Sequence, residues 1–225
     1  MRTIFVGDVH GCAQELSEML MRLCFNAETD RLFLTGDAFT KGPDPMGVWH
    51  QIVETGAEMV LGNHDDALWS RLLKRSKDQE DKPLNPDHKR TVDVLMPVIS
   101  EVILWIEKLP LFIETSDFLL VHAGINPQRE LSGTVRDEFL TIRTWPPTKG
   151  IDGKRWHHVY QPIRPLLIFG HDAPGGLVVK RGKNRDPYLI GLDSGCVYGN
   201  QLSAYILEEK RIVQIESNQI KRFSE

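Results

Sequence analysis

The sequence predicts an α/β fold in which mixed β-sheets are flanked by helices. Three observations lead to this prediction: strands alternate with helical patterns in the first third, strands follow one another in the second half, and metal-capable side chains come directly after several strands. Strand–helix–strand order favours parallel pairing, whereas consecutive strands favour hairpins. With 225 residues and a hydrophobic share of 41%, we expect one domain spanning 1–225.

The first third of the chain alternates short strands with longer helices. Strands are predicted at 3–6, 31–35 and 58–61, and a glycine directly follows each of them. Residues 12–24 form the first helix, with Leu16, Met19, Leu20 and Leu23 at helical spacing. A second helix is expected at 44–55, and a third follows from Asn63, a capping residue, to about Arg75.

The middle of the chain is dense in charge. Residues 71–90 contain eleven charged side chains and two prolines, so we expect a charged surface insertion or exposed loop without an apolar face. Residues 91–106 recover a strong helical pattern, in which Pro97 predicts a kink or a break.

The second half reads as mostly β-structure in hairpins. A tight turn at 116–117 joins the first two strands. The predicted strands are 111–114, 118–122, 166–169, 177–181, 188–192, 202–207 and 211–215.

The net charge of −4 argues against a broad nucleic-acid surface. The charge is uneven, however, because residues 141–190 hold nine Lys or Arg against three Asp or Glu. This basic stretch is a candidate wall of an anion-binding cleft. No apolar run approaches the roughly 20 residues of a membrane span. The amino terminus lacks a signal-peptide pattern, so we expect a cytoplasmic protein without membrane partners.

Three cysteines, Cys12, Cys24 and Cys196, complete the composition. Their number is odd and no two have a Cys-x-x-Cys spacing, so neither a disulfide framework nor a zinc knuckle is expected. Buried, reduced thiols are the prediction.

Five glycine-containing motifs follow predicted strands. Carboxyl ends of strands are where α/β sheets form ligand sites, and mixed Asp and His ligands suit Mn, Fe or Zn better than Ca or Mg. One such motif alone is weak, because a buried His is more often a hydrogen-bonded core residue. The motifs are Gly7-Asp8-Val9-His10-Gly11, Gly36-Asp37 with Lys41-Gly42-Pro43, Gly62-Asn63-His64-Asp65, Val121-His122-Ala123-Gly124 and Gly170-His171-Asp172.

The remaining histidines lack this setting and are predicted to be surface or core residues. They are His50, His88, His157 and His158.

In their order, the five motifs resemble those of the calcineurin-like metallophosphoesterases and, more narrowly, of the phosphoprotein phosphatase family. The segment 192–199 is also similar to the carboxyl-terminal part of that family. The resemblance implies a sandwich of mixed sheets with a dinuclear metal site at the strand ends. The cofactors would be two divalent metal ions, with Mn expected and Fe or Zn as alternatives.

The resemblance also assigns roles by motif position. Asp8 and His10 would hold the first metal, and Asp37 would bridge both. The second metal would be held by Asn63, His122 and His171. Two such cations lower the pKa of a shared water, and the resulting hydroxide attacks phosphorus.

His64 would donate a proton to the leaving group or position the group that does. Arg143, in a segment like the family's Trp-Ile-Arg, would bind phosphate, although a surface ion pair explains it equally well.

One motif departs from the family. Thr40-Lys41 stands where an Asp-Arg pair is usual, so Thr40 offers the catalytic histidine only a neutral hydrogen bond. Lys41 is a point charge without the fork geometry of arginine. This is either a loss of catalytic quality or the signature of the ApaH-like phosphatases, which the motif Gly-Asp-x-x-x-Lys-Gly-Pro resembles.

Three functions follow from these expectations. The first is hydrolysis of phosphoanhydride bonds in dinucleoside polyphosphates, such as diadenosine tetraphosphate, or in capped RNA. The second is a Ser/Thr protein phosphatase with the same metals and a different groove. The third is a metal-stabilised, non-catalytic binding scaffold. The substrate would thus be a nucleotide or another phosphorylated molecule, and the sequence predicts no oligomeric state.

Overall fold

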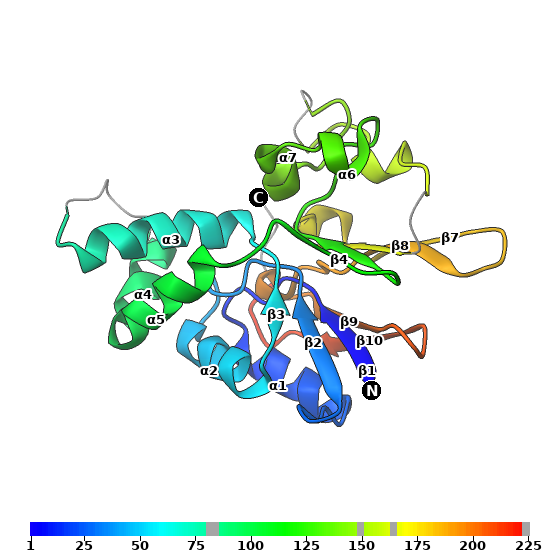
Figure 1. Cartoon of the computed structure of the whole chain (residues 1–225). Helices are drawn as coiled ribbons and strands as arrows, with labels where there is room; N and C mark the ends of the chain where they lie inside the picture. Colours follow the sequence, from blue (N-terminus) through cyan, green and yellow to red (C-terminus); the bar gives the residue numbers. More distant parts are fainter. Residues whose placement is uncertain (80–85, 148–150, 163–165, 222–225) are drawn as a thin grey trace.

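The computed structural model describes residues 1–79, 86–147, 151–162 and 166–221, which contain two five-stranded sheets. In space the strands run β10-β9-β1-β2-β3 in the first sheet and β4-β5-β6-β8-β7 in the second (Figure 1). Both sheets mix parallel and antiparallel pairs, so the predicted α/β fold with mixed sheets and flanking helices is confirmed.

The first sheet is built around the alternating strands and helices of the amino-terminal third. Its parallel strands are β1 (Arg2–Val6), β2 (Asp30–Leu34) and the short β3 (Glu58–Met59). The helices between them are α1 (Ala13–Arg22) and α2 (Pro45–Thr55). A carboxyl-terminal hairpin of β9 (Gln201–Ile206) and β10 (Arg211–Glu216) completes the sheet, with β9 antiparallel to β1.

The second sheet contains the hairpin predicted at the turn 116–117, a second hairpin, and a parallel core that the sequence did not predict. Strands β4 (Phe112–Glu114) and β5 (Leu119–Val121) form one hairpin, and β7 (Val178–Arg181) and β8 (Pro187–Gly191) form the other. Strand β6 (Leu167–Phe169) lies between β5 and β8 and is parallel to both.

A long connection makes this parallel pairing of β5 and β6 feasible. It contains α6 (Glu130–Gly133), α7 (Arg136–Thr141) and a 3₁₀ turn, η3 (Trp156–His158). These helices are short and lack a sustained apolar period, and for that reason the sequence pattern did not predict them.

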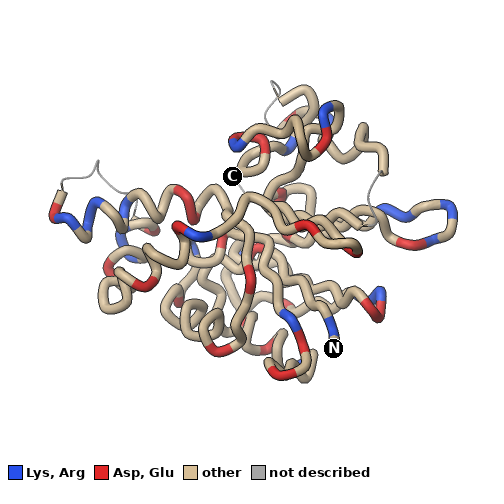
Figure 2. Tube along the Cα trace, in the orientation of Figure 1, with Lys and Arg blue, Asp and Glu red and all other residues tan. Residues whose placement is uncertain are grey.

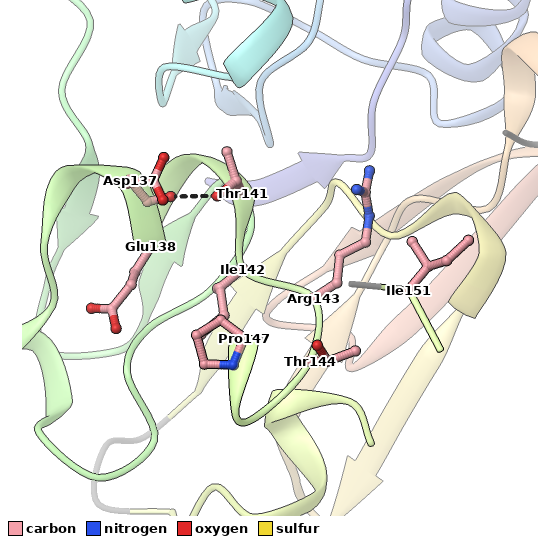
Figure 3. Close-up of a pocket in the computed structure, with 8 residues that line it drawn as sticks. All are labelled: Asp137, Glu138, Thr141, Ile142, Arg143, Thr144, Pro147 and Ile151. Carbon is pink, nitrogen blue, oxygen red and sulfur yellow. Dashed lines mark hydrogen bonds between the residues drawn. The ribbon is translucent and has the colours of Figure 1, made fainter. Parts of the chain in front are cut away.

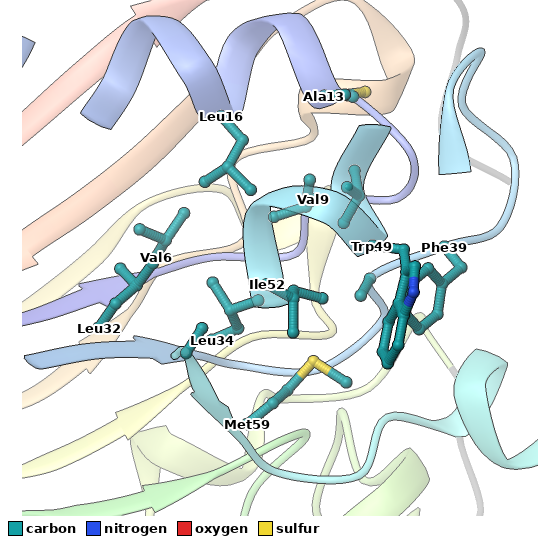
Figure 4. Close-up of a cluster of buried hydrophobic side chains, with 14 of the residues drawn as sticks. Val6, Val9, Ala13, Leu16, Leu32, Leu34, Phe39, Trp49, Ile52 and Met59 are labelled. Atoms are coloured by element: carbon teal, nitrogen blue, oxygen red, sulfur yellow. The ribbon is translucent and has the colours of Figure 1, made fainter. Parts of the chain in front are cut away.

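The two sheets pack face to face, as the alternation along β1 shows. Phe5 belongs to an inner cluster with residues of both sheets, including Leu120 and Ile190. Its neighbours Ile4 and Val6 belong to the outer cluster beneath α1 and α2. Figure 4 shows side chains of this outer cluster, with those of β1 and β2 gathered below the two helices. Burying each such side chain contributes about 1.5–3 kcal/mol.

The expected exposed loop without an apolar face at 71–90 was wrong from residue 86 onward and at Leu72, whereas the helix predicted from Asn63 to about Arg75 is confirmed. Helix α3 (Asn63–Ser76) runs into this range, and α4 (Pro86–Leu95) begins inside it. Leu72 is fully buried, one turn after the buried Leu68, so one apolar stripe continues beneath the charged side chains. Positions 80–85 lie outside the described residues.

The predicted break at Pro97 is confirmed. The chain forms a 3₁₀ turn, η1 (Met96–Val98), between α4 and α5 (Ile99–Glu107). Helices α3, α4 and α5 lie together beside the sheets (Figure 1). Within the described parts of the chain, no helix has the length and apolarity needed to cross a membrane.

The prediction for the cysteines is confirmed for two of the three. Cys12 and Cys196 are buried and free, whereas Cys24 is exposed and free. Cys24 follows α1 in a left-handed conformation, with φ of 46°, and this turn leaves its thiol in solvent.

His157 predicts a pH dependence of stability. It is buried beside Trp156 and Phe169, and burial, together with the charge of Lys180, lowers its pKa to about 3. In the unfolded chain this histidine becomes protonated near pH 6.5, whereas in the folded chain it stays neutral until about pH 3. The free energy of unfolding therefore decreases as the pH falls from 6.5 toward 3.

A His157→Phe variant should therefore lose less stability than wild type between pH 6.5 and about pH 5. Urea unfolding at both pH values measures this, with His50→Phe, at an exposed position of α2, as the control. An unchanged pH dependence in His157→Phe would contradict the assignment.

Candidate metal centre

The predicted metal-ligand residues come together at the carboxyl ends of the parallel strands. Asp8 and His10 follow β1, Asp37 follows β2 and Asn63 follows β3. His122 follows β5 and His171 follows β6 in the second sheet. Both sheets thus contribute side chains to one site.

Asp37 lies at the centre of this site. Its Oδ2 is 3.6 Å from His10 Nε2 and 3.5 Å from His122 Nε2. Potential ligand atoms of His10, Asp37 and His64 lie within 4.8 Å of one another, and so do those of Asp37, His122 and His171. Asp37 is the member common to both groups, as expected for a carboxylate between two cations.

The orientation of His122 fits a cation. Its Nδ1 lies 2.8 Å from the carbonyl oxygen of Thr35, which accepts a hydrogen bond when this nitrogen carries the ring proton. The lone pair of Nε2 then faces Asn63 Oδ1 at 3.0 Å. Two acceptors this close are compatible when a cation binds both. The buried Nε2 of His171 also has no hydrogen-bond partner among the described residues.

Asp8 is held from two sides. Its Oδ1 accepts a hydrogen bond from the Thr35 hydroxyl (2.6 Å), and its Oδ2 accepts one from the His171 amide (2.9 Å). Asp8 does not belong to either compact group of ligand atoms given above. Gly170 permits this arrangement, since a Cβ there would lie 2.0 Å from Asp8 Oδ1.

The backbone of the site is strained. His10, Asp37, Lys41 and His171 all have left-handed conformations, with φ of 48°, 54°, 71° and 66°. Residues other than glycine rarely adopt this region, and such strain concentrates at functional sites.

Burial sets the electrostatics of the centre. It raises the pKa of Asp8 well above its usual value, and the nearby charge of Asp37 adds to this effect. Burial also lowers the pKa values of His10 and His171 well below the ordinary value. Buried carboxylates close to one another repel, and divalent cations between them would remove that penalty.

His64 lies at the start of α3, beside the predicted metal ligands. Its amide donates to Asp37 Oδ1 (2.9 Å), and its ring is 5.2 Å from that of His10. Burial lowers the pKa of His64 to about 4, although Asp37 opposes the shift. His88, predicted to be an ordinary surface or core residue, lies beside it with 6.2 Å between the ring centres.

Asp65 is a site residue that sequence reasoning missed. It is fully buried, and its carboxylate accepts hydrogen bonds from the amides of Asp37 (2.6 Å) and Ala38 (3.0 Å). Burial and the charge of Asp37 raise its pKa to about 7. The residue was visible as the last letter of Gly-Asn-His-Asp, but nothing in that pattern indicated that it anchors the neighbouring loop.

The role expected for Thr40 was wrong. Its hydroxyl lies 3.4 Å from His10 Nδ1, so Thr40 faces a predicted metal ligand and is not placed to orient His64. Lys41 Nζ lies 3.4 Å from His10 Nε2 and donates to the hydroxyl of Tyr198 (3.0 Å). Tyr198 belongs to the carboxyl-terminal motif, but its link to Lys41 depends on tertiary structure.

Arg143 lies beside the predicted metal ligand His171. One of its terminal nitrogens donates to the carbonyl oxygen of His171 (3.1 Å), and its Nε is 3.9 Å from Asp172. Arg155 forms the shorter contact with Asp172, at 2.5 Å, so Arg143 is only a weak partner in that ion pair.

A cavity of about 230 Å³ lies beside Arg143. Figure 3 shows the Arg143 side chain extending away from the other residues that line it. The lining residues are Asp137, Glu138, Thr141, Ile142, Arg143, Thr144, Pro147 and Ile151.

The described residues of the basic stretch 141–190 do not form one continuous wall. Arg143 and Arg155 lie near the site, whereas positions 180–185 belong to the β7–β8 hairpin at the edge of the second sheet (Figures 1 and 2). Lys180 donates to the carbonyl oxygen of His157, away from the metal ligands. Lys149, also counted in the stretch, lies outside the described residues.

The comparisons with known proteins agree with this geometry. The family model described as calcineurin-like phosphoesterase matches residues 1–212. The chain therefore belongs to the calcineurin-like phosphoesterase family, as the motifs predicted. It is a metal-dependent hydrolase of phosphoric ester or anhydride bonds, and membership implies a dinuclear site for divalent metals.

Similar proteins include curated relatives named symmetrical bis(5'-nucleosyl)-tetraphosphatase. The relative from Vibrio parahaemolyticus is 37% identical, covering 94% of this chain and 97% of its own length. That from Proteus mirabilis is 36% identical, covering 94% and 96%.

Solved structures show the same fold. A crystal structure described as a diadenosine tetraphosphatase is 32% identical, with a TM-score of 0.75 over 96% of this chain and 93% of that one. A yeast protein serine/threonine phosphatase is 14% identical, with a TM-score of 0.61 over 97% and 81%, and this likeness concerns the fold alone.

Proposed function

We propose that this chain hydrolyses phosphoanhydride bonds of dinucleoside polyphosphates, with diadenosine tetraphosphate as the model substrate. The observation that carries the proposal is the position of Asp37 between two groups of buried metal-capable side chains, one on each sheet. The names of the relatives supply the substrate class. A single domain over 1–225 would contain the whole catalytic apparatus.

Two divalent cations would be held by the predicted ligands. We assign Asp8 and His10 to one, Asn63, His122 and His171 to the other, and Asp37 to both. Manganese is the expected metal, with iron and zinc as alternatives, because mixed carboxylate and imidazole donors suit all three. When bound, the cations supply a hydroxide nucleophile and neutralise phosphoryl charge.

The remaining site residues act on the substrate. Lys41 lies next to His10 and offers a single positive charge to the phosphoryl group, while Arg143 offers N–H groups. His64, neutral above a pKa of about 4, would donate a hydrogen bond to the leaving oxygen and stabilise the charge that develops there, while water would supply the proton. The cavity beside Arg143 gives the remainder of a long substrate a place to lie.

The test is a product profile. Manganese-loaded protein should convert diadenosine tetraphosphate to nucleotides well above an Asp37→Asn control, and capped RNA and a phosphopeptide should be assayed beside it. Faster turnover of the phosphopeptide than of any dinucleotide would favour a protein phosphatase. No turnover of any substrate above the control would favour a non-catalytic scaffold.

Tyr198→Phe should weaken substrate binding by Lys41. The variant removes the hydroxyl that accepts a hydrogen bond from Lys41 Nζ, so the Lys41 side chain becomes free to move. The lost hydrogen bond contributes about 1.5 kcal/mol. We expect a roughly tenfold fall in kcat/KM for diadenosine tetraphosphate. Tyr188→Phe, on β8, is the matched control and should keep wild-type kinetics. Equal kinetics in both variants would contradict the role of Lys41.

A further inference from the structure

A second cluster of metal-capable groups lies apart from the catalytic ligands. Cys12, Glu15 and Cys196 are each essentially fully buried, and their ligand atoms lie within 4.8 Å of one another. The three residues come from the start of α1 and from the 3₁₀ turn η5 (Cys196–Tyr198). None of them has a role in the proposed hydrolysis.

The carboxylate of Glu15 points to what this cluster binds. Its Oε1 accepts three hydrogen bonds, from the Asn218 amide (2.9 Å), the Gln219 side chain (3.1 Å) and the Ser217 hydroxyl (3.3 Å). Its Oε2 is buried and has no hydrogen-bond partner among the described residues. A buried carboxylate oxygen without a partner is costly, and a bound cation would satisfy it.

The two sulfur atoms define the chemistry of that cation. The sulfur atoms of Cys12 and Cys196 lie within 4.8 Å of each other and of a carboxylate oxygen of Glu15. A disulfide between them would leave Glu15 Oε2 unsatisfied, whereas a cation would engage all three residues. Thiolates together with a carboxylate favour zinc over manganese or magnesium.

We propose that Cys12, Glu15 and Cys196 form a structural zinc site, separate from the catalytic metals. Binding releases the two thiol protons to solvent as two Zn–S bonds form, and no electrons are transferred. The carbonyl oxygen of His10, 3.9 Å from Cys12 Sγ, is a further oxygen donor beside the site.

Such a site would hold in place two segments that carry residues of the catalytic site. Cys12 follows the predicted ligand His10 by two residues, and Cys196 precedes Tyr198, the partner of Lys41, by two. Through its Oε1, Glu15 also accepts hydrogen bonds from the carboxyl-terminal segment 217–219. One bound ion thus connects the first motif, α1 and the end of the chain.

Cobalt(II) substitution tests the proposal, because only a thiolate site gives the intense near-ultraviolet band of a cobalt–sulfur bond. The catalytic ligands contain no sulfur. In a cobalt titration, the intensity of this band should saturate at one cobalt per chain for wild type and for Asp37→Asn. The same result is expected for Cys24→Ser, which changes the exposed cysteine. Zinc should displace the cobalt and abolish the band.

Cys196→Ser should remove the band, and Glu15→Gln, which keeps both thiols, should weaken cobalt binding at least tenfold. Circular dichroism establishes that each variant is folded. The proposal is overturned if wild type shows no cobalt–sulfur band, or if the band survives in folded Cys196→Ser. Intact-mass detection of a Cys12–Cys196 disulfide in protein purified without reductant would overturn it as well.

Discussion

Asp37→Asn is expected to abolish hydrolysis, lowering kcat for diadenosine tetraphosphate by roughly 10³-fold or more. The reason is the central position of Asp37, whose Oδ2 lies between His10 and His122. Asparagine keeps the shape but removes the negative charge that both cations would share. A thousandfold loss corresponds to about 4 kcal/mol of transition-state stabilisation. Steady-state kinetics with manganese measures it.

Asp66→Asn is the matched control for this variant. Asp66 lies at the start of α3 and forms its ion pair with Arg136, outside the metal-ligand groups. It should retain wild-type kcat. If Asp37→Asn retained more than about a tenth of wild-type kcat, Asp37 would not be a shared ligand, since losing one such group costs far more.

His64→Gln is expected to lower kcat by about 10²–10⁴-fold while leaving the metal content unchanged. Its ring lies beside that of His10, and its low pKa makes it a neutral hydrogen-bond donor at neutral pH. The loss should be smaller for p-nitrophenyl phosphate, whose leaving group needs little protonation.

His50→Gln, at an exposed position of α2, is the control for this second prediction. Metal analysis of His64→Gln is essential because the His64 ring belongs to one of the two compact ligand groups. Loss of one metal per chain would show that His64 is a metal ligand instead of a hydrogen-bond donor to the substrate. An equal loss of kcat for both substrates would also contradict the proposed hydrogen bond from His64 to the leaving oxygen.

The sequence predicted those features of the site that depend on short segments. Asp8, Asp37 and His122 each follow a strand within three residues, and parallel strands bring their carboxyl ends to the same edge. Local sequence therefore determined where these side chains lie. The pairing of β5 with β6 was not predicted, because short helices in a long connection leave no periodic signal.

Contacts between distant segments were beyond the reach of the sequence pattern. Thr40 faces His10 and not His64, and Tyr198 contacts Lys41 across more than 150 residues. Cys12 and Cys196 meet although no spacing relates them. Such contacts depend on which strands pair and on how the loops at the strand ends pack, which periodicity does not encode.

The expectation that 71–90 lacks an apolar face was wrong for a different reason. Many charges suggested an exposed loop, but charges on one face of a helix are compatible with a buried leucine on the other, as at Leu72. Composition alone does not separate a solvated loop from an amphipathic helix.

The number of manganese ions bound per chain tests the central claim most directly. Equilibrium dialysis followed by elemental analysis should find two manganese ions per chain in wild type and a loss of tight binding of both in Asp37→Asn, with Asp66→Asn unchanged. A single manganese ion in wild type, or two in Asp37→Asn, would contradict an Asp37 that joins two metal ions at the strand ends.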